Sequence, residues 1–571
     1  MKKRLIALVL AGAMAASLAA CGGTSSSTAS TDTKASTESA AETTDAGDAG
    51  ADSADAEEIV IPVHEANYEG TAHSATKKHE LLNVAISVEP GDLSPEQSAD
   101  GTGNMWRWNV YEHLFEINGF GGDLVGATAE KYEQIDDTTY RIYLYQGVTD
   151  SDGNELHSSD VKYAYDTLKA AGNRMSGDIA KYETIEVIDD YTFDMIMNEP
   201  LTGLSDLSAI LGQCYVYTEK AAQDHNLAVD PCGTGPYKVT DYQSGSSITM
   251  EARDDYWAEG TDHQTIRQCA NVQTLVYKVV AEPAQNATGL QTGAIDFSTG
   301  VSATDISKFD EGGEYADSFH TVQYLSNLSV ALFANCDADH DDLNLRLAIF
   351  YALDGEQLAD ASGLNAYLVA HTLANAKYPE FQDEWYTQDN YYNVQDLDKA
   401  AEYLAASNYD GRALTLLVQN SATNENMAVA IQAMLMQIGI TVDINSVDGT
   451  IVDSEQQAGN YDLEITQMAS DNYMPIIWQR WFDTDFHGDR PIINNASDDK
   501  LQEMVSALNT VEGDTPEAIS EFHQYLIDNA YGYALFSECT SDVITNDIVT
   551  ECWNFQDFLV PGGCIYADNE F

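Results

Sequence analysis

The sequence predicts a mixed α/β protein whose folded body has more than one lobe. Residues 59–571 exceed the length of about 250–300 residues at which a single hydrophobic core stops growing. Hydrophobic residues in this body follow both the alternation of strands and the helical spacing of about 3.6 residues. A hydrophobic fraction of 44% over the whole chain is ordinary for a globular protein.

Residues 1–21 have the pattern of an export signal. The basic run Lys2-Lys3-Arg4 precedes an apolar segment, residues 5–16, that is too short to span a bilayer permanently. Leu18-Ala19-Ala20-Cys21 follows and resembles the lipobox of bacterial lipoproteins, which implies a lipid on Cys21. We therefore expect lipid anchoring at the outer face of the cytoplasmic membrane, extracellular or periplasmic. An ordinary cleaved signal is the alternative.

Residues 22–58 predict a flexible, acidic tether. They consist almost entirely of Ser, Thr, Ala, Gly, Asp and Glu, and they cannot bury enough apolar surface to offset the entropy of ordering. The tether holds only nine acids, so most of the net charge of −67 belongs to the body. Such a surface repels nucleic acid and anionic headgroups. Alternatively, the acidic surface could bind calcium or cationic substrates.

The first part of the body is predicted to be rich in strands. Residues 81–88 indicate a strand, residues 106–117 a helix rich in aromatics, and residues 139–145 an alternating strand. A surface turn at residues 150–154 precedes a helix that we expect to begin with Ser158 as its N-cap.

From about residue 330 the pattern becomes α/β. Residues 397–404 form one helical face. Residues 414–418 alternate as a strand, residues 427–438 carry a helical stripe that Gly439 ends, and residues 440–444 alternate again. A right-handed crossover would place these two strands in parallel.

No enzyme motif or metal motif is present. The chain has no G-x-S-x-G elbow, no H-E-x-x-H and no phosphate-binding loop, although a carboxylate pair of glycosidase type is not excluded. Residues 337–341 begin like a calcium loop but depart from it at Asp342 and Ala348. No cysteine–histidine cluster occurs in the sequence, so neither a zinc site nor a cofactor is expected. Seven body cysteines leave the pairing open, with Cys539–Cys552 as one candidate bridge.

Several runs together resemble the family 5 extracellular solute-binding proteins, the peptide- and nickel-type receptors of ABC importers. The most specific run is Gly233-Thr234-Gly235-Pro236-Tyr237-Lys238, followed by Asp254-Asp255-Tyr256-Trp257. Further matching runs, in family order, are residues 122–126, 129–133, 136–140, 159–163, 293–297, 343–354, 439–442 and 460–462.

The resemblance implies a two-lobed α/β fold of the periplasmic-binding-protein type, class II-like and with a large first lobe. Lobe I would comprise residues 60–328 and 531–571, and lobe II residues 329–530. Two hinge crossings would join them, and the lobes would close around a ligand.

The resemblance also implies a ligand-binding acid. Peptide-binding members carry a W-x-A-D-Y-x-[DE]-P segment whose acid meets the free amino group of the ligand. Aligned on Pro475, the acid is Asp471, and Asn472 and Tyr473 follow it. The run departs from the motif at Met468, Ser470, Asn472 and Met474, which weakens the inference that the ligand is a peptide.

Two stretches rich in aromatics are further candidates to line the site. Aromatic rings give contact area with few rotors to freeze, and Arg480 could bind a carboxylate bidentately. Core packing is the alternative for most of these residues, and we expect two or three to face the ligand. The candidates are Asn104, Trp106, Tyr111, Trp478, Arg480 and Trp481.

The function implied is a monomeric, lipid-anchored receptor, not an enzyme. It would capture a peptide or similar small solute and deliver it to ABC permease subunits. The alternatives are the same fold binding an oligosaccharide or metal chelate, the same fold acting as a sensor, and a surface hydrolase.

Overall fold

The computed structural model describes residues 72–97, 101–117, 124–201, 204–336, 341–364, 367–370, 372–386, 392, 394–468, 474–483, 498–508, 515–554 and 557–571. Residues 60–571 form one compact unit, separate from residues 1–59. Cys21, Asp471, Asn472 and Tyr473 lie outside the described residues.

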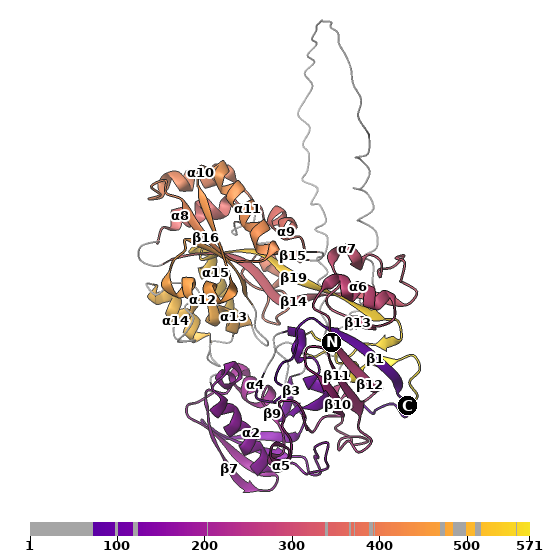
Figure 1. Ribbon diagram of the computed structural model, residues 1–571. Helices are drawn as coiled ribbons and strands as arrows, with labels where there is room; N and C mark the ends of the chain where they lie inside the picture. Colours follow the sequence, from indigo (N-terminus) through magenta and orange to yellow (C-terminus); the bar gives the residue numbers. More distant parts are fainter. Residues whose placement is uncertain are drawn as a thin grey trace, which may run out of the picture. The chain divides into compact units, whose positions relative to one another are not determined.

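One large sheet runs through this unit (Figure 1). Its strand order is β10-β11-β12-β1-β13-β19-β14-β18-β16-β17, and β15 also pairs with β19. The strands are β1 (His79–Ile86), β10 (Tyr237–Gln243), β11 (Ser247–Ala252), β12 (Val272–Val279), β13 (Phe297–Ser298), β14 (Phe319–Ala334), β15 (Tyr367–Val369), β16 (Leu414–Gln419), β17 (Val442–Val447), β18 (Leu463–Met468) and β19 (Gly532–Thr545).

The two long strands, β14 and β19, join the halves of this sheet. They pair antiparallel from Phe319 opposite Thr545 to Phe333 opposite Gly532, and the register shifts between Leu325 and Ser329. Before the shift β19 pairs with β13, and beyond it β14 pairs with β18. Each strand therefore contributes to both halves of the sheet.

The N-terminal part adds a four-stranded antiparallel sheet, β5-β6-β8-β7, and two small two-stranded antiparallel sheets, β2-β9 and β3-β4. A last pair, β20-β21, lies near the C-terminus. The bounds are β2 (Glu112–His113), β3 (Phe115–Ile117), β4 (Leu124–Gly126), β5 (Ala129–Asp136), β6 (Thr139–Leu144), β7 (Tyr182–Asp189), β8 (Thr192–Met197), β9 (Tyr215–Val216), β20 (Ile548–Thr550) and β21 (Ile565–Tyr566).

Helices of the first part are short apart from α2. They are α1 (Arg107–Val110), α2 (Ser158–Ala171), α3 (Arg174–Asp178), α4 (Leu204–Gly212), α5 (Glu219–Asp224), α6 (Pro283–Gln291) and α7 (Ala303–Ile306). The 3-10 turns among the described residues are η1 (Gly101–Asn104), η2 (Ile266–Gln268), η3 (Asp383–Tyr386) and η4 (Pro561–Gly563).

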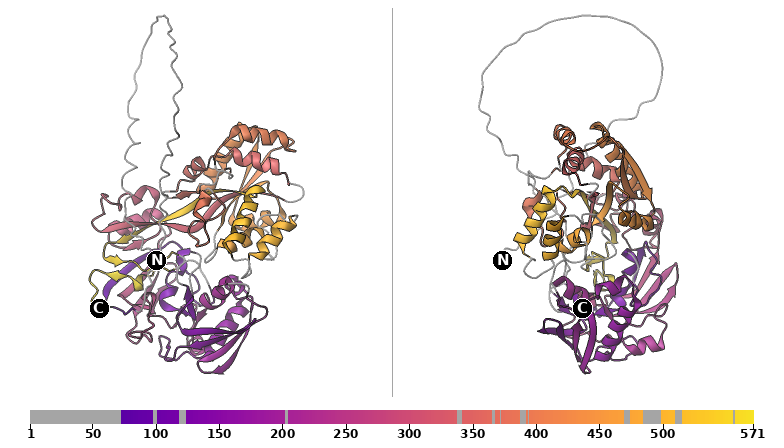
Figure 2. Two further views of the ribbon diagram at one scale, coloured as in Figure 1. Left: turned by 180° about the vertical axis from the view of Figure 1, so that it is seen from behind. Right: turned by 90° about the vertical axis from the view of Figure 1, so that its left-hand side faces the viewer.

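The helices of residues 343–528 pack on both faces of the strands from β14 to β17 (Figures 1 and 2). They are α8 (Leu343–Tyr351), α9 (Gly355–Ser362), α10 (Leu397–Ala406), α11 (Ala422–Gln437), α12 (Gly449–Ala458), α13 (Met474–Phe482), α14 (Asp499–Ala507) and α15 (Pro516–Asp528). The predicted strand–helix–strand unit is confirmed as β16-α11-β17, with β16 and β17 parallel.

Two local predictions are wrong. The helix expected over residues 106–117 is limited to α1, because β2 and β3 are drawn into pairing with β9 and β4. The N-cap of α2 is His157 and not Ser158, because the carboxylate of Asp160 accepts the backbone N–H of His157 at 2.8 Å.

The hydrophobic cores follow the same division as the sheet. The largest cluster draws on residues 330–536 and includes Phe333 and Phe536 from the two long strands. Three other clusters draw on residues 82–324 and 543–566, and they include Tyr324 and Ile544 from the same strands. Within the described residues, no helix is both long and apolar enough to cross a membrane.

Candidate functional site

A buried polar cluster lies where β14 and β19 shift register. We call Tyr324, Asn375, Lys377, Asp542 and Asp557 the crossing cluster. Nζ of Lys377 forms an ion pair with Asp557 and donates a hydrogen bond to the carbonyl oxygen of Leu325 at 2.9 Å. The side chains of Lys377 and Asp557 are only 0% and 5% exposed, so the pair is shielded from water.

The other members of the crossing cluster join three segments. The hydroxyl of Tyr324 lies 3.0 Å from Oδ2 of Asp542 and 2.8 Å from the carbonyl oxygen of Asp557. Nδ2 of Asn375 donates to the carbonyl oxygen of Ser326 at 3.1 Å. The segment of residues 372–386 and the turn that contains Asp557 are therefore fixed to the two long strands.

Burial sets the electrostatics of the crossing cluster. Desolvation lowers the pKa of Lys377, because an ammonium group loses its hydration there. Desolvation also raises the pKa of Asp542 to about 8, although the hydrogen bond from Tyr324 opposes the shift. Asp542 is therefore mostly protonated at neutral pH.

The segment of residues 101–111 approaches the same turn. The ring of Trp108 packs on that of Phe558 with centroids 5.5 Å apart, and Phe558 follows Asp557 directly. Asn104 of η1 is half-buried, and Trp106 and Tyr111 are buried. Among the described residues, Nε1 of Trp106 and the hydroxyl of Tyr111 have no hydrogen-bond partner. These are two unsatisfied buried polar groups in a segment predicted to line the site.

The glycine-rich run that starts at Gly233 packs against this segment. A Cβ at Gly233 would lie 2.2 Å from the carbonyl oxygen of Val110, and one at Gly235 would lie 2.7 Å from that of Asn109. The two glycines are therefore required by close backbone approach, and they hold the 109–111 backbone in place.

The aromatic candidates of α13 are packed in the core. Nε1 of Trp478 donates to the carbonyl oxygen of Leu373 at 2.8 Å, and the ring of Trp481 stacks on Phe333 with centroids 4.8 Å apart. Both side chains are buried. The side chain of Arg480 lies outside the described part of the chain.

The run that carries Asp471 starts beside the crossing cluster. β18 ends at Met468, whose backbone pairs with Ser329 at the register shift, and α13 begins at Met474. The structure thus brings together the register shift, the 101–111 segment and the starting point of the Asp471 run. It leaves Trp478 and Trp481 in core positions.

Sequence reasoning missed the crossing cluster. Lys377 stands between Ala376 and Tyr378 in a chain with only 26 Lys and Arg residues, and Asp542 interrupts a strand pattern before Val543. Neither residue stands in an apolar run, because Asn375 and Glu380 lie near Lys377 and Ser541 precedes Asp542, so no local signal of their burial was available.

A separate cavity of about 290 Å³ lies between α8, residues 408–414 and the start of β18. Its two arginines are already paired: Nη1 of Arg346 lies 2.9 Å from Asp341, and Arg412 pairs with Asp462. The cavity therefore offers no uncommitted cation to a ligand.

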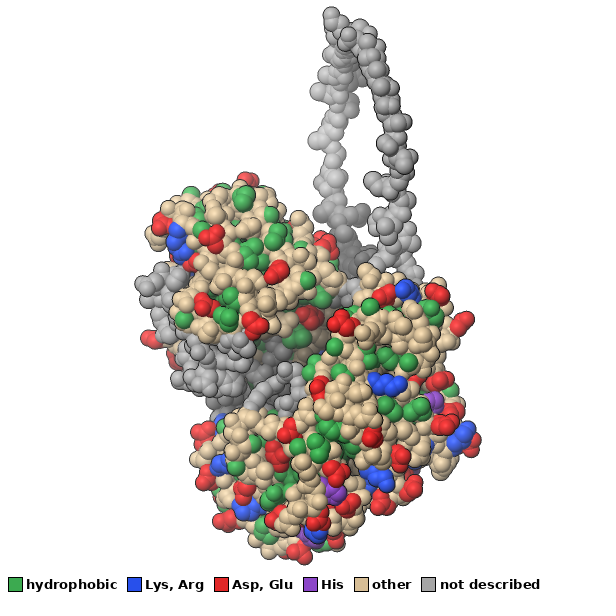
Figure 3. Space-filling model, viewed as in Figure 1, with side chains coloured by type: hydrophobic (Ala, Val, Ile, Leu, Met, Phe, Trp, Pro, Cys, Tyr) green, Lys and Arg blue, Asp and Glu red, His purple; other side chains and the backbone are tan. Residues whose placement is uncertain are grey.

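Two predictions about cysteines and surface charge can also be compared with the structure. Cys539 and Cys552 both carry free thiols, so the bridge considered between them is not formed. Acidic side chains are scattered over the face shown in Figure 3 and outnumber the basic ones, as the net charge of −67 indicates.

Comparison with known proteins identifies the class. Residues 123–488 match the model of the bacterial extracellular solute-binding proteins, family 5, and the chain belongs to this family. The chain is 22% identical over 493 residues to the probable D,D-dipeptide-binding periplasmic protein DdpA of Escherichia coli, covering 82% of this chain and 90% of that protein.

Solved structures share the fold. The oligopeptide-binding protein AppA from Bacillus subtilis, in complex with a nonapeptide, has a TM-score of 0.66 at 17% identity and covers 86% of this chain and 100% of that chain. NikA from Brucella suis, in complex with Fe(III)-EDTA, has a TM-score of 0.70 at 20% identity, with coverages of 85% and 99%. The predicted two-lobed α/β class is confirmed, and the family consists of solute-binding proteins and not of hydrolases.

Proposed function

We propose that this chain captures a peptide or similar small solute between two lobes, residues 60–328 with 531–571 and residues 329–530, and delivers it to ABC permease subunits. Anchoring would be through a lipid on Cys21, with residues 22–58 as the tether, and the receptor would act as a monomer. The separate hydrophobic cores on the two sides of the register shift support this division. The similarity to DdpA, a probable D,D-dipeptide-binding protein, and to AppA, which is solved with a nonapeptide, supports a peptide as the solute.

The solute would bind beside the crossing cluster. The observation that carries this assignment is the meeting of three segments there: the turn with Asp557, the segment with Trp106 and Tyr111, and the end of β18 at Met468. Asp471 would then pair with the ammonium group of the solute, since a carboxylate and an ammonium form a strong charge-assisted hydrogen bond. Asn104, Asn472, Tyr473 and Arg480 would be further contacts.

A thermal-shift screen of dipeptides, longer peptides, oligosaccharides and nickel chelates tests the solute class. A ligand at 100 times its Kd stabilises the folded state by about 2.7 kcal/mol, which a melting curve detects. Stabilisation by peptides is expected. Stabilisation by sugars or chelates alone would contradict the peptide assignment; a chelate is the second candidate, because NikA is solved with one.

Asp471→Asn tests the contact directly. It should weaken binding of a peptide with a free amino terminus by at least tenfold and leave the N-acetylated peptide unchanged, as measured by calorimetry. Equal loss for both peptides would remove the proposed role. For the anchor, Cys21→Ala should abolish incorporation of labelled fatty acid in cells, and labelling that persists in the variant would exclude Cys21.

A further inference from the structure

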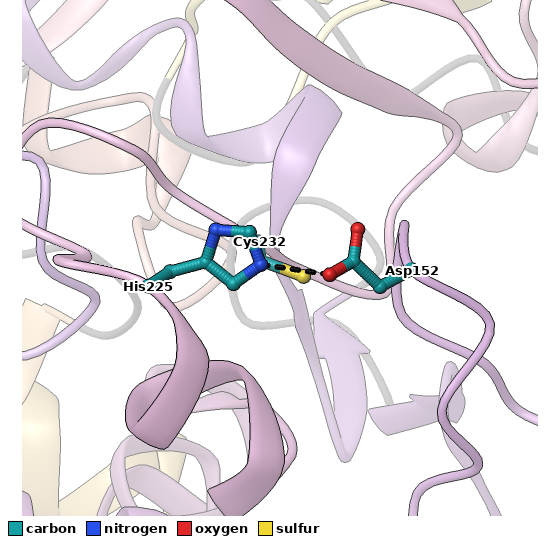
Figure 4. A group of neighbouring side chains, drawn as sticks. All are labelled: Asp152, His225 and Cys232. Atoms are coloured by element: carbon teal, nitrogen blue, oxygen red, sulfur yellow. Dashed lines mark hydrogen bonds and ion pairs between the residues drawn. The ribbon is translucent and has the colours of Figure 1, made fainter.

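Three side chains of different chemistry converge on one point in the N-terminal part of the body (Figure 4). They are Asp152, His225 and Cys232, which we call the Asp–His–Cys triad. One ligand atom of each lies within 4.8 Å of those of the other two. We propose that the triad is a binding site for a zinc-like divalent transition metal, with the fourth coordination position left to water.

The histidine is oriented as a metal ligand. Nδ1 of His225 lies 2.7 Å from Oδ2 of Asp230, so the carboxylate of Asp230 accepts the Nδ1 proton. Nε2 points to Oδ2 of Asp152, also at 2.7 Å, and without a metal it donates its proton to that carboxylate; a metal ion would take the place of this proton (Figure 4). A carboxylate that holds the far nitrogen of a ligating histidine is the usual second partner in zinc sites, where it fixes the tautomer and the ring orientation.

Three short segments position the ligands independently of any metal. The turn of Asp152 is held by the buried Asp150, which accepts from the backbone N–H of Asp152 at 3.0 Å and from the hydroxyl of Thr218 at 2.6 Å. Asp150 itself is buried, whereas Asp152 and Gly153 of the predicted surface turn are exposed. The backbone N–H of Ser151 donates to the carbonyl oxygen of Gly233 at 3.0 Å, which fixes the turn against the loop of Cys232.

The donor set selects the metal. A thiol and an imidazole favour zinc and related transition metals, whereas calcium takes six to eight oxygen ligands. Zinc bonds of about 2.0–2.1 Å to nitrogen and oxygen in a tetrahedron separate these two atoms by about 3.3 Å. The distance of 2.7 Å between Nε2 of His225 and Oδ2 of Asp152 would therefore open by about 0.6 Å. Binding replaces the thiol proton of Cys232 and the Nε2 proton of His225, and both protons are released to water.

The site also has an open side. Cys232 is buried, while the side chains of His225 and Asp152 are 20% and 48% exposed. An ion can therefore enter from solvent and meet the buried sulfur last. Because the three ligands come from separate segments, a bound ion would cross-link the turn of Asp152, the end of α5 and the loop before Gly233. This site was not predictable from the sequence, because Asp152 lies far from the other two ligands along the chain.

Metal titration of the full-length, reduced chain in a Cys21→Ala background tests the proposal. Zinc should bind at one ion per chain and raise the melting temperature, and Co²⁺ should produce a thiolate-to-cobalt charge-transfer band. Cys232→Ser and His225→Gln should abolish that band. Asp230→Asn should weaken the affinity for the metal by about 10–100-fold but should leave the band in place.

Matched controls keep the test specific. Cys539→Ser removes a half-buried thiol elsewhere, and His320→Gln removes a histidine that pairs with Glu551 and Asn546, so both variants should bind cobalt as the parent does. The proposal is overturned if zinc does not bind, if cobalt binds without the band, or if the band survives in Cys232→Ser or is lost in Cys539→Ser. Circular dichroism of each variant shows whether a lost band reflects unfolding.

Discussion

The crossing cluster and the Asp–His–Cys triad use similar residue types in opposite ways. In the crossing cluster the charges of Lys377 and Asp557 are enclosed and paired with each other. In the triad His225 and Asp152 are partly exposed and converge on a buried thiol. The first arrangement fixes the position of three segments, and the second leaves ligand atoms available to an ion. The two regions contain similar residue types, so the degree of burial, more than residue identity, decides whether charged side chains form a structural ion pair or a binding site.

Breaking the ion pair of the crossing cluster should have the largest effect. Lys377→Met leaves Asp557 buried without its cation, which costs about 3–5 kcal/mol of unfolding free energy in comparable cases. Denaturant titration measures the loss. Adding Asp557→Asn to the same chain should recover part of it.

An exposed lysine provides the control for that prediction. Lys399 lies 3.8 Å from Asp396 with side chains 55% and 38% exposed, so Lys399→Met should change stability by less than about 1 kcal/mol. Similar losses at Lys377 and Lys399 would show that enclosure of the first pair has no energetic consequence.

Gly233 lies next to both regions, because it follows Cys232 of the Asp–His–Cys triad and packs on Val110 of the 101–111 segment. Gly233→Ala should destabilise the protein by about 1–3 kcal/mol, since the added Cβ would lie 2.2 Å from a backbone oxygen that must move. Thermal melting measures the effect. Gly177→Ala is the matched control, because a Cβ there meets nothing within 4 Å; an unchanged melting temperature in Gly233→Ala would refute the steric argument.

The last prediction concerns the pH dependence of stability. The pKa of Asp542 is about 8 in the folded state and about 3.9 when unfolded, so the folded state holds more protons between these values and its stability falls as pH rises through that window. The groups facing Asp542 are Tyr324 and, through it, Asp557 with Lys377. Asp542→Asn should lessen the decline between pH 5 and pH 8, as measured by denaturation at several pH values. A slope equal to that of the parent would contradict the shift.

Regular patterns were predictable from the sequence wherever one element's own residues decide its structure. The unit β16-α11-β17 follows from alternation, a helical stripe and Gly439, whose φ of 88° ends the helix. The 106–117 segment was not predictable, because β2 and β3 depend on partners far along the chain. Tertiary pairing overrode the local helical pattern there.

The candidate site was predictable only in part. Family likeness indicated Asp471 and the aromatic stretches, but it did not indicate that Trp478 and Trp481 face the core. Lys377 and Asp557 are 180 positions apart, and no local pattern relates them. Residues that meet across a fold leave no periodic signal, so their pairing required the structure.

The two long strands have a thermodynamic consequence. Phe333 and Tyr324 lie on one strand, Phe536 and Ile544 on the other, and each strand places side chains in both cores. If either core unfolded, β14 and β19 would lose packing contacts, and the other core depends on the same two strands. Calorimetry should therefore record a single cooperative heat-absorption peak, and not two separable transitions, even though the polypeptide encloses distinct hydrophobic interiors.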